Sequence, residues 1–419
     1  MDFQTVSVIG LGYIGLPTSA ILATHGVHVI GVDVNAEVVK TINAGHIHIV
    51  EPELDAVVSG VVAAGRLRAV VQPEPADAFI IAVPTPITKD RAPDLTYVES
   101  ATRSIAPYLQ KNSLVILEST SPVGTTEKVC EWLAAERPDL RFPRQATSTD
   151  GGGPLDVNVV YCPERVLPGH VLHELVYNDR IIGGMTRQCA ERAASLYNTF
   201  LKGECVITNS RTAEMAKLSE NAYRDVNIAF ANELSLLADE LHVNAWELIE
   251  VANRHPRVNI LQPGPGVGGH CIAVDPWFLV HSVPAESRLI RTAREINDLR
   301  PRRIACKAIE KAARFSKPII ACLGLSYKAD IDDLRESPAI EIVHEIAQAA
   351  IGTVLVVEPH VQHLPSPLDG FADLRLARLD EALSQADIIL LLVNHRQFKN
   401  IDRGVLMEKV VIDTRGLWR

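Results

Sequence analysis

The stretch VSVIGLGYIG, residues 6–15, decides the fold of the first part of the chain. A short apolar run is followed directly by glycines in the pattern Gly-x-Gly-x-x-Gly, and helix-like sequence begins at Leu16. Glycines at Gly10, Gly12 and Gly15 allow a tight turn, close approach of a pyrophosphate to the backbone, and close packing of the helix on the strand. The N-terminus of that helix offers free N–H groups to phosphates. The stretch therefore predicts a strand, a turn and a helix that bind a dinucleotide.

An acidic residue in the expected place supports this interpretation. Asp33 follows the second predicted strand, residues 27–32, where its carboxylate can accept hydrogen bonds from the adenosine ribose and would repel a 2′-phosphate. We therefore expect NAD rather than NADP, although the motif alone is also compatible with a glycine-rich loop that binds nothing. The segment containing Thr85, which follows the third strand, is either a nucleotide contact or a rigid turn.

The alternation of apolar runs with helical periodicity predicts parallel sheets flanked by helices. Strands are expected at residues 6–9, 27–32, 78–83, 114–117 and 157–161, and again at 319–323, 353–357, 388–393 and 410–412. Between the two sets, residues 212–241 contain no Pro or Gly and predict one long helix. We expect an α/β fold with two doubly wound, Rossmann-like parallel-sheet domains joined by that helix. The expected domains are 1–200, 201–300 and 301–419, with Pro301 at the last boundary.

Composition excludes several classes of function. The 419 residues include 41 Lys or Arg and 51 Asp or Glu, a net charge of −10 that argues against binding to nucleic acid or anionic membranes. The seven cysteines are scattered and form no Cys-x-x-Cys pair, so a disulfide framework or a zinc site is not expected. We expect no metal, no signal peptide, no membrane insertion and a cytoplasmic location.

The segment PGPGVGGHC, residues 263–271, predicts a chemically active loop. Its glycines let a ligand lie against the backbone, and an exposed thiol beside an imidazole can have a lowered pKa. A thiolate combined with NAD suggests aldehyde chemistry through a thioester at Cys271. His270 is either catalytic or a loop histidine bound to backbone. Four other cysteines are expected to be small buried hydrophobic residues: Cys130, Cys189, Cys306 and Cys322.

Charged residues elsewhere predict anion binding less specifically. Lys217, Asn221 and Arg224 share one face of the long helix, either as a site or as a solvated face paired with Glu214, Glu220 or Asp225. Glu164 and Thr120 follow predicted strands at the edge where open α/β sheets bind ligands. Arg254-His255-Pro256-Arg257 is a compact positive cluster. The first strand of the last domain is followed by a turn that lacks the second and third glycines of the motif, so a second NAD site is not expected there. Lys328 and Arg335 follow this strand and either bind another anion or are surface charges.

Together these motifs closely resemble the UDP-glucose/GDP-mannose 6-dehydrogenase family over essentially the whole chain. His270 before the cysteine and Val274-Asp275-Pro276-Trp277 after it resemble the branch that acts on N-acetylhexosamines. The resemblance implies oxidation of a UDP-N-acetylhexosamine at C6 to a carboxylate with two NAD and one water, for surface polysaccharide biosynthesis of the enterobacterial common antigen type. The implied substrate is UDP-N-acetyl-D-mannosamine.

The resemblance also assigns residues by motif position. Those implied in catalysis are Cys271 as nucleophile, Lys217 at the C6 oxygen, Glu164 as base, and Asn221, Thr120 and Asp275 as orienting groups. Those implied to contact NAD, with the three glycines, are Tyr13, Ile14, Asp33, Thr85 and Thr126. Those implied to contact the UDP-sugar are Arg165, Val166, Lys217, Asn221, Arg224, His255, Arg257, Gly268, Tyr327, Lys328, Arg335 and Arg415.

Two alternative functions remain possible at this point, and the resemblance also implies an oligomeric state. A substrate of UDP-N-acetylglucosamine or UDP-glucose is the nearest alternative, and a non-catalytic NAD-binding sensor is an alternative of another class. Within the family, the arginine equivalent to Arg257 can reach a neighbouring subunit, which implies a homodimer. The glycine-rich loop at residues 147–153 has no expected role.

Overall fold

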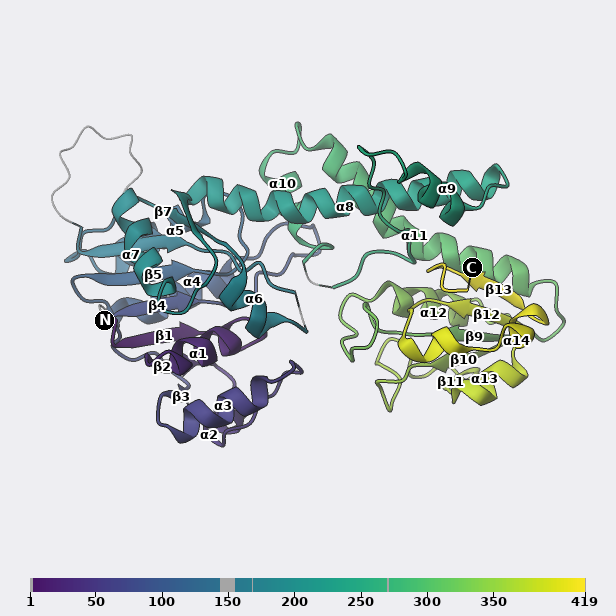
Figure 1. The fold of residues 1–419 in the computed structure, drawn as a ribbon, viewed down its shortest axis with the longest axis horizontal. Coiled ribbons are helices and arrows are strands. Elements are labelled where there is room, and N and C mark those ends of the chain that lie inside the picture. Colours follow the sequence, from purple (N-terminus) through teal and green to yellow (C-terminus); the bar gives the residue numbers. More distant parts are fainter. Residues whose placement is uncertain (1–2, 144–154, 168, 270, 419) are drawn as a thin grey trace. The chain divides into compact units, whose positions relative to one another are not determined.

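The computed structural model describes residues 3–143, 155–167, 169–269 and 271–418, which form two compact units, Met1–Ser219 and Glu220–Arg419 (Figure 1). His270 and the loop at 147–153 lie outside the described residues. Among the helices described, none is long and apolar enough to cross a membrane. The two units are treated separately below.

The first unit is built on an eight-stranded sheet with the order β3-β2-β1-β4-β5-β6-β7-β8. The strands are β1 (Thr5–Ile9), β2 (His28–Val32), β3 (Leu67–Val70), β4 (Ala78–Ile81), β5 (Ser113–Leu117), β6 (Val157–Tyr161), β7 (Arg180–Gly184) and β8 (Cys205–Asn209). Strands β1 to β6 are all parallel to one another, which brings their carboxyl ends to one edge of the sheet. That edge carries the glycine turn and the motifs after β4, β5 and β6.

Helices cover both faces of this sheet (Figure 1). They are α1 (Gly15–Thr24), α2 (Ala36–Asn43), α3 (Leu54–Ala63), α4 (Thr96–Ile105), α5 (Thr125–Glu136), α6 (Val171–Tyr177) and α7 (Arg187–Tyr197), with the 3₁₀ turn η1 (Ala106–Tyr108). Alternate residues of β5 point to opposite faces: Leu114 and Ile116 join one apolar cluster, Val115 and Leu117 the other. Helices α1, α3, α6 and α7 pack on the first cluster, α4 and α5 on the second.

The expected fold class is confirmed, and the sequence patterns missed three strands of this sheet. These are β3, β7 and β8, and β7 runs antiparallel to β6, so this edge of the sheet is mixed. The edge strand β8 is largely exposed and contains Thr208 and Asn209. An edge strand needs no continuous apolar run, because only part of it is covered, and its sequence therefore carries a weak signal.

Helix α8 (Ser210–Glu240) is the long helix expected from the absence of Pro and Gly, and it has 31 residues. The division between the two units falls within it. The second unit continues through α9 (Ala245–Ala252), α10 (Asp275–Ser282) and α11 (Arg288–Ala312). Pro301 lies inside α11 and is buried, so the chain stays helical across the expected boundary, although a proline removes one helical hydrogen bond.

The second unit contains a five-stranded parallel sheet with the order β11-β10-β9-β12-β13. Its strands are β9 (Ile319–Leu323), β10 (Thr353–Val357), β11 (Leu374–Leu376), β12 (Ile388–Leu391) and β13 (Val410–Asp413). Its helices are α12 (Pro338–Gln348), α13 (Leu379–Gln385), α14 (Arg403–Met407) and the 3₁₀ turn η2 (Arg396–Asn400). The sequence predicted four of these five strands and missed β11, which is only three residues long.

Candidate functional site

The glycine turn after β1 has the geometry that a dinucleotide requires. Gly10 has φ of +94°, and a Cβ there would lie 2.6 Å from the Ala82 carbonyl oxygen. A Cβ on Gly15 would lie 1.8 Å from the Gly10 carbonyl oxygen, so the start of α1 can approach the turn only without a side chain. A Cβ on Gly12 would meet no described atom within 4 Å. Two glycines therefore serve the fold, and the third leaves the backbone open to a ligand.

Asp33 is fixed beside this turn at the end of β2. Its Oδ2 accepts a hydrogen bond from the Leu11 N–H at 3.1 Å, and its Oδ1 accepts one from the Asn35 N–H at 2.9 Å. Each carboxylate oxygen keeps a further lone pair for a ribose hydroxyl. Tyr13 and Ile14 lie in the turn immediately before α1. These residues fit a dinucleotide that is placed across the turn.

The segments after β4 and β5 are joined by side-chain hydrogen bonds. The Thr85 hydroxyl donates to the Thr120 carbonyl oxygen at 2.6 Å, and the Ser119 hydroxyl donates to the Val83 carbonyl oxygen at 2.7 Å. The structure therefore brings together Thr85, expected at the nucleotide, and Thr120, expected to orient the C6 oxygen and the water.

Thr126 is held by a buried carboxylate from α8. Its hydroxyl and its N–H donate to Glu214 Oε1 at 2.6 and 2.8 Å, and the Gly124 N–H donates to Oε2 at 2.6 Å. Burial raises the pKa of Glu214, an effect that these hydrogen bonds oppose. Glu214 was one expected partner of Lys217. In the structure its carboxylate instead accepts hydrogen bonds at the N-terminus of α5. The Thr126 hydroxyl proton is thus committed to Glu214.

Lys217 meets the segment after β6. Its Nζ donates to the Glu164 carbonyl oxygen at 2.6 Å and lies 3.9 Å from Glu164 Oε2, and both side chains are largely buried. The Glu164 carboxylate also accepts a hydrogen bond from the Val166 N–H, and Arg165 donates to the Asp179 carbonyl oxygen. The first unit therefore brings together an ammonium group and a carboxylate that the sequence placed 53 positions apart.

A buried ion pair behind this edge was missed from the sequence. Glu118 follows β5 and accepts hydrogen bonds from Arg180 at 3.0 Å and from the Tyr197 hydroxyl at 2.9 Å. Arg180 also approaches the Cys162 sulfur at 3.8 Å. Burial raises the pKa of Cys162 to about 11, so this thiol is a poor nucleophile. Glu118 directly precedes Ser119 and Thr120, a position that signalled its place at the same edge.

In the second unit, Cys271 lies at the entrance to α10. The Cys271 carbonyl oxygen accepts hydrogen bonds from the Val274 N–H at 3.1 Å and the Asp275 N–H at 2.9 Å. The Asp275 carboxylate accepts a hydrogen bond from the Asn221 side chain at 2.6 Å, and both residues are buried. The turn therefore joins the cysteine to the carboxylate and amide expected beside it.

Cys271 is half-buried, as is Cys205 on the edge strand β8. Cys130, Cys189 and Cys322 are buried, as expected, and burial raises the pKa of Cys322 to about 12. The expectation for Cys306 is wrong: it lies on an exposed face of α11. The helical pattern around Cys306 did not distinguish the two faces, because α11 is mostly polar.

The glycine loop packs against the segment after β9. A Cβ on Gly268 would lie 2.6 Å from the Glu336 carbonyl oxygen and 2.8 Å from Tyr327 Cβ, and a Cβ on Gly264 would lie 3.0 Å from Arg415 Nη1. Burial lowers the pKa of Arg415 to about 10. Gly268, Tyr327 and Arg415, all expected at the UDP-sugar, are therefore neighbours of one loop.

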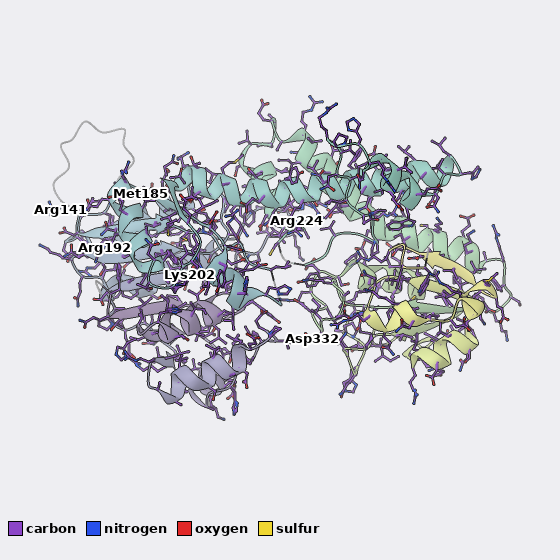
Figure 2. The ribbon with its side chains drawn as sticks, viewed as in Figure 1. Arg141, Met185, Arg192, Lys202, Arg224 and Asp332 are labelled. Carbon is purple, nitrogen blue, oxygen red and sulfur yellow. The ribbon has the colours of Figure 1, made fainter. Side chains whose placement is uncertain are left out.

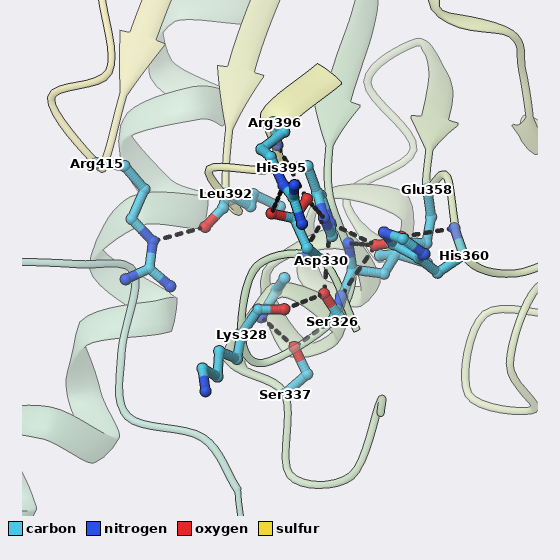
Figure 3. Close-up of polar contacts among 12 residues, drawn as sticks. Ser326, Lys328, Asp330, Ser337, Glu358, His360, Leu392, His395, Arg396 and Arg415 are labelled. Atoms are coloured by element: carbon cyan, nitrogen blue, oxygen red, sulfur yellow. Dashed lines mark hydrogen bonds and ion pairs between the residues drawn. The ribbon is translucent and has the colours of Figure 1, made fainter. Parts of the chain in front are cut away.

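The turn carrying Lys328 is held by buried hydrogen bonds (Figure 3). Glu358 Oε2 accepts hydrogen bonds from the Leu325 N–H at 2.6 Å and the Ser326 N–H at 3.1 Å. The Ser326 hydroxyl donates to the Lys328 carbonyl oxygen at 2.7 Å. Glu358 follows β10 as Asp33 follows β2, but its carboxylate is buried and committed to the protein. That the second sheet does not bind a dinucleotide stays a prediction.

Asp330, His360 and His395 are close enough to one another to be considered as a metal site. However, His395 Nδ1 accepts a hydrogen bond from the Asp330 N–H at 2.9 Å, so Nε2 carries the proton that faces Glu358 at 3.2 Å. The Asp330 carboxylate accepts hydrogen bonds from Arg396. Because the His395 ring nitrogens and the Asp330 carboxylate already have these partners, the contacts favour a hydrogen-bonded cluster over a metal site.

Four of the expected substrate contacts are exposed, and two of them are joined by a hydrogen bond from the Arg257 N–H to His255 Nδ1 at 3.3 Å. Arg224 lies on α8 (Figure 2), and His255 and Arg257 lie in the exposed segment after α9. Arg335 is half-exposed and binds the Asp333 carboxylate at 2.6 Å. An anion would have to compete with Asp333 for this guanidinium group.

Three family profiles match consecutive parts of the chain. They are the NAD binding domain, the central domain and the UDP binding domain of the UDP-glucose/GDP-mannose dehydrogenase family, at residues 4–201, 211–299 and 321–419. Together they cover most of the sequence.

Named relatives cover the full length of the chain. An NDP-N-acetyl-D-galactosaminuronic acid dehydrogenase from Ralstonia nicotianae is 61% identical over 100% of this chain and 97% of its own length. A UDP-N-acetyl-D-mannosamine dehydrogenase from Escherichia coli is 59% identical over 100% of both chains. Among solved structures, a UDP-D-ManNAc dehydrogenase from Pyrococcus horikoshii is 40% identical with a TM-score of 0.87, covering 99% of this chain and 96% of that one. A UDP-N-acetyl-mannosamine dehydrogenase from Staphylococcus aureus is 41% identical with a TM-score of 0.85, covering 99% and 95%.

Proposed function

The chain belongs to the UDP-glucose/GDP-mannose dehydrogenase family, and we propose that it is an NAD-dependent 6-dehydrogenase of UDP-N-acetyl-D-mannosamine. The expected product is the corresponding uronic acid, a charged sugar for a surface polysaccharide of the enterobacterial common antigen type. The relatives named for the mannosamine sugar support this substrate. The relative named for a galactosaminuronic acid favours a second candidate, UDP-N-acetyl-D-galactosamine.

The observation that carries the proposed chemistry is the short turn from Cys271 to Asp275. The carbonyl oxygen of the half-buried Cys271 accepts a hydrogen bond from the Asp275 N–H, and the buried Asp275 carboxylate accepts one from Asn221, whereas Cys130, Cys189 and Cys322 are buried in apolar clusters. A thiol can add to the aldehyde formed in the first oxidation and retain it as a thiohemiacetal. Loss of the second hydride converts the thiohemiacetal to a thioester, so no free aldehyde is released. Water then hydrolyses the thioester and regenerates the thiol.

Residues of the first unit are proposed to bind NAD, which accepts one hydride in each of the two oxidations. The backbone at Gly12 would receive the pyrophosphate and Asp33 the ribose. Tyr13, Ile14, Thr85 and Thr126 are proposed as further contacts. For Thr126 the contact would use the hydroxyl oxygen as acceptor, because its proton is donated to Glu214.

Proton transfer is proposed for the Lys217–Glu164 pair. The Lys217 ammonium group is largely buried and lies 3.9 Å from the Glu164 carboxylate, and its positive charge is proposed to stabilise negative charge on the C6 oxygen. Glu164 would act as base toward the water that hydrolyses the thioester. Thr120, Asn221 and Asp275 would orient the oxygen and the water.

Residues of each unit are proposed as contacts of the UDP-sugar, and in the second unit Gly268, Tyr327, Lys328 and Arg415 belong to the glycine loop, the Lys328 turn and the segment beside them. The residues proposed as contacts are Arg165, Val166, Lys217, Asn221, Arg224, His255, Arg257, Gly268, Tyr327, Lys328, Arg335 and Arg415. Three domains are proposed for these tasks: 1–200 for NAD, 201–300 for the cysteine loop and 301–419 for UDP. The three family profiles support this division. A cytoplasmic location stays a prediction.

A homodimer is proposed from an apolar stripe on α8. Tyr223, Phe230 and Leu237 are spaced by seven residues and are 68%, 54% and 51% exposed. Residues seven apart lie on the same face of a helix, and a stripe of this kind on a second copy would bury both. The same association could bring Arg257 to the partner's site.

Two measurements test the proposed function. NADH formation with the N-acetylmannosamine, N-acetylgalactosamine, N-acetylglucosamine and glucose derivatives of UDP should be fastest with the first, and mass analysis should show the acid with two NADH formed per sugar. Fastest turnover on another sugar would contradict the assignment of the substrate. Cys271→Ser should abolish net NADH formation, while Cys306→Ser, an exposed cysteine of the same unit, should leave it unchanged. Full activity in Cys271→Ser would contradict the thioester route.

A further inference from the structure

We propose that a chain of buried polar side chains on α8 and α11 positions Cys271 by holding both ends of the segment 264–272. The inference rests on the proposed function, because it assigns a role toward the proposed nucleophile. The chain consists of Asp225 and Asn232 on α8 and Arg294, Asn297 and Arg300 on α11. None of them is proposed to touch the substrate; they are positioning residues.

The first end of the segment is held at Gly264 by two opposed hydrogen bonds. The Gly264 N–H donates to Asn232 Oδ1 at 2.9 Å, and Arg300 Nε donates to the Gly264 carbonyl oxygen at 3.0 Å. Both backbone polar groups of Gly264 are thus bound by side chains from different helices. This fixes the plane and direction of the chain where the glycine loop begins.

The second end is held one residue beyond the cysteine. Arg294 Nη1 donates to the Ile272 carbonyl oxygen at 3.4 Å and to Asp225 Oδ1 at 2.6 Å. Its Nη2 donates to Asp298 on the same helix. The guanidinium group is therefore oriented by two carboxylates while it binds the backbone beside Cys271.

Asn297 connects the two ends. Its Nδ2 donates to Asp225 Oδ1 at 2.8 Å and to the Asp225 carbonyl oxygen at 3.0 Å, and its Oδ1 accepts a hydrogen bond from Asn232 at 2.9 Å. Arg294, Asn297 and Arg300 follow one another at three-residue intervals, so they lie along one side of α11. The result is a continuous hydrogen-bonded path from Gly264 to Ile272.

The energetics of this chain favour a positioning role over a purely stabilising one. Asp225, Asn232, Arg294 and Asn297 are at most 2% exposed, and burying charged groups has a large desolvation cost. Among the described residues, Asp225 Oδ2 and Arg294 Nε have no hydrogen-bond partner, so the pair is not fully satisfied. Replacing such a pair with apolar side chains is often neutral or stabilising. What an apolar side chain cannot do is donate a hydrogen bond to the Ile272 carbonyl oxygen, as Arg294 does.

The segment itself needs an external hold. It contains Gly264, Gly266, Gly268 and Gly269, and glycine loses more conformational freedom on ordering than any other residue. A catalytic thiol that moves by about 1 Å can lose about 10²-fold in rate. Hydrogen bonds at Gly264 and Ile272 limit the backbone conformations available to the segment that they enclose.

The test is the double substitution Asp225→Leu with Arg294→Met, which removes the buried ion pair and the contact with Ile272. Asp298, which also binds Arg294, is 33% exposed, so the double variant leaves no buried unpaired charge. The expected result is a melting temperature equal to or above that of the wild-type protein and kcat reduced about 10²-fold. The dissociation constants for NADH and UDP should change by less than about threefold, because neither substituted side chain is a proposed contact of NADH or UDP. Mass analysis should still find Cys271 alkylated by iodoacetamide.

Further variants decide the remaining outcomes. If the double variant does not fold, Arg294→Lys, which keeps the charge but not the guanidinium geometry, should lower kcat without changing the dissociation constant for UDP. Ile346→Val, a core residue of α12, is the control: it should lower the melting temperature and leave kcat unchanged.

Wild-type kcat in a folded double variant, or in Arg294→Lys, would overturn the inference. The inference would also be overturned if Ile346→Val and the Asp225/Arg294 variants lost the same amount of melting temperature and the same amount of kcat. An inactive wild-type protein on every UDP-sugar would instead contradict the proposed function.

Discussion

Alanine substitutions at Gly12 and Gly15 should separate binding from folding within one motif. Both glycines belong to the turn between β1 and α1, and a Cβ has opposite surroundings at the two positions. At Gly15 it would lie 1.8 Å from the Gly10 carbonyl oxygen, so the backbone must move by more than about 1 Å to restore a normal contact. At Gly12 it would meet no described atom within 4 Å, and φ lies outside the left-handed region.

The expected magnitudes follow from these surroundings. Overpacking at Gly15 should cost about 1–3 kcal/mol, which for a unit of about 200 residues lowers the melting temperature by roughly 2–12 °C. Gly12→Ala should change stability by less than about 1 kcal/mol, because the backbone tolerates an L residue there. The new methyl group would keep the pyrophosphate from the backbone, and losing one hydrogen bond to a charged group weakens NADH binding about 10- to 10²-fold.

Differential scanning calorimetry and NADH fluorescence titration measure the two effects independently. Gly60→Ala is the control: Gly60 lies inside α3, and an added Cβ would meet no described atom within 4 Å. This substitution should change the melting temperature and the affinity for NADH only slightly. NADH binding at wild-type affinity in Gly12→Ala would refute the placement of the pyrophosphate. An equal loss of melting temperature in Gly12→Ala and Gly15→Ala would refute the division of roles.

Three other predictions concern separate parts of the chain. Asp33→Ala should weaken NADH binding by about tenfold or more and leave UDP binding unchanged in calorimetric titrations, because its carboxylate is the proposed ribose contact. Burial acts to raise the pKa of Glu358, but hydrogen bonds from His395 and the Leu325 N–H lower it below the ordinary 4.5. The ionised carboxylate therefore stabilises the fold above pH 4.5, and this contribution disappears as pH falls through the lowered pKa. Glu358→Gln should lower the melting temperature at pH 7, by an amount that shrinks below pH 4.5; a constant difference would contradict the assignment. Phe230→Glu should convert the proposed dimer to a monomer in light scattering, whereas a substitution of exposed Lys307 should not.

Strongly periodic segments were predictable because their local sequence already determines their structure. The glycine turn, the buried strands such as β5 and the long helix α8 each satisfy a pattern that few other conformations accommodate. The residue types expected at the site were identified for the same reason, since phosphate approach requires glycine and aldehyde capture requires a thiol. Edge strands such as β8 carry little of this signal, because they are only partly covered.

The sequence alone determined the α/β class, the dinucleotide turn with its Asp33 and the distinctive loop that carries Cys271. It did not determine which side chains meet, because pairing between residues far apart in the chain depends on how elements pack. Only the tertiary structure showed that Glu214 binds Thr126 rather than Lys217, that Cys306 is exposed, and that Asp225 belongs to a buried chain around the glycine loop. A charged residue on a helix has several candidate partners at similar spacing, and burial against one particular helix face decides among them.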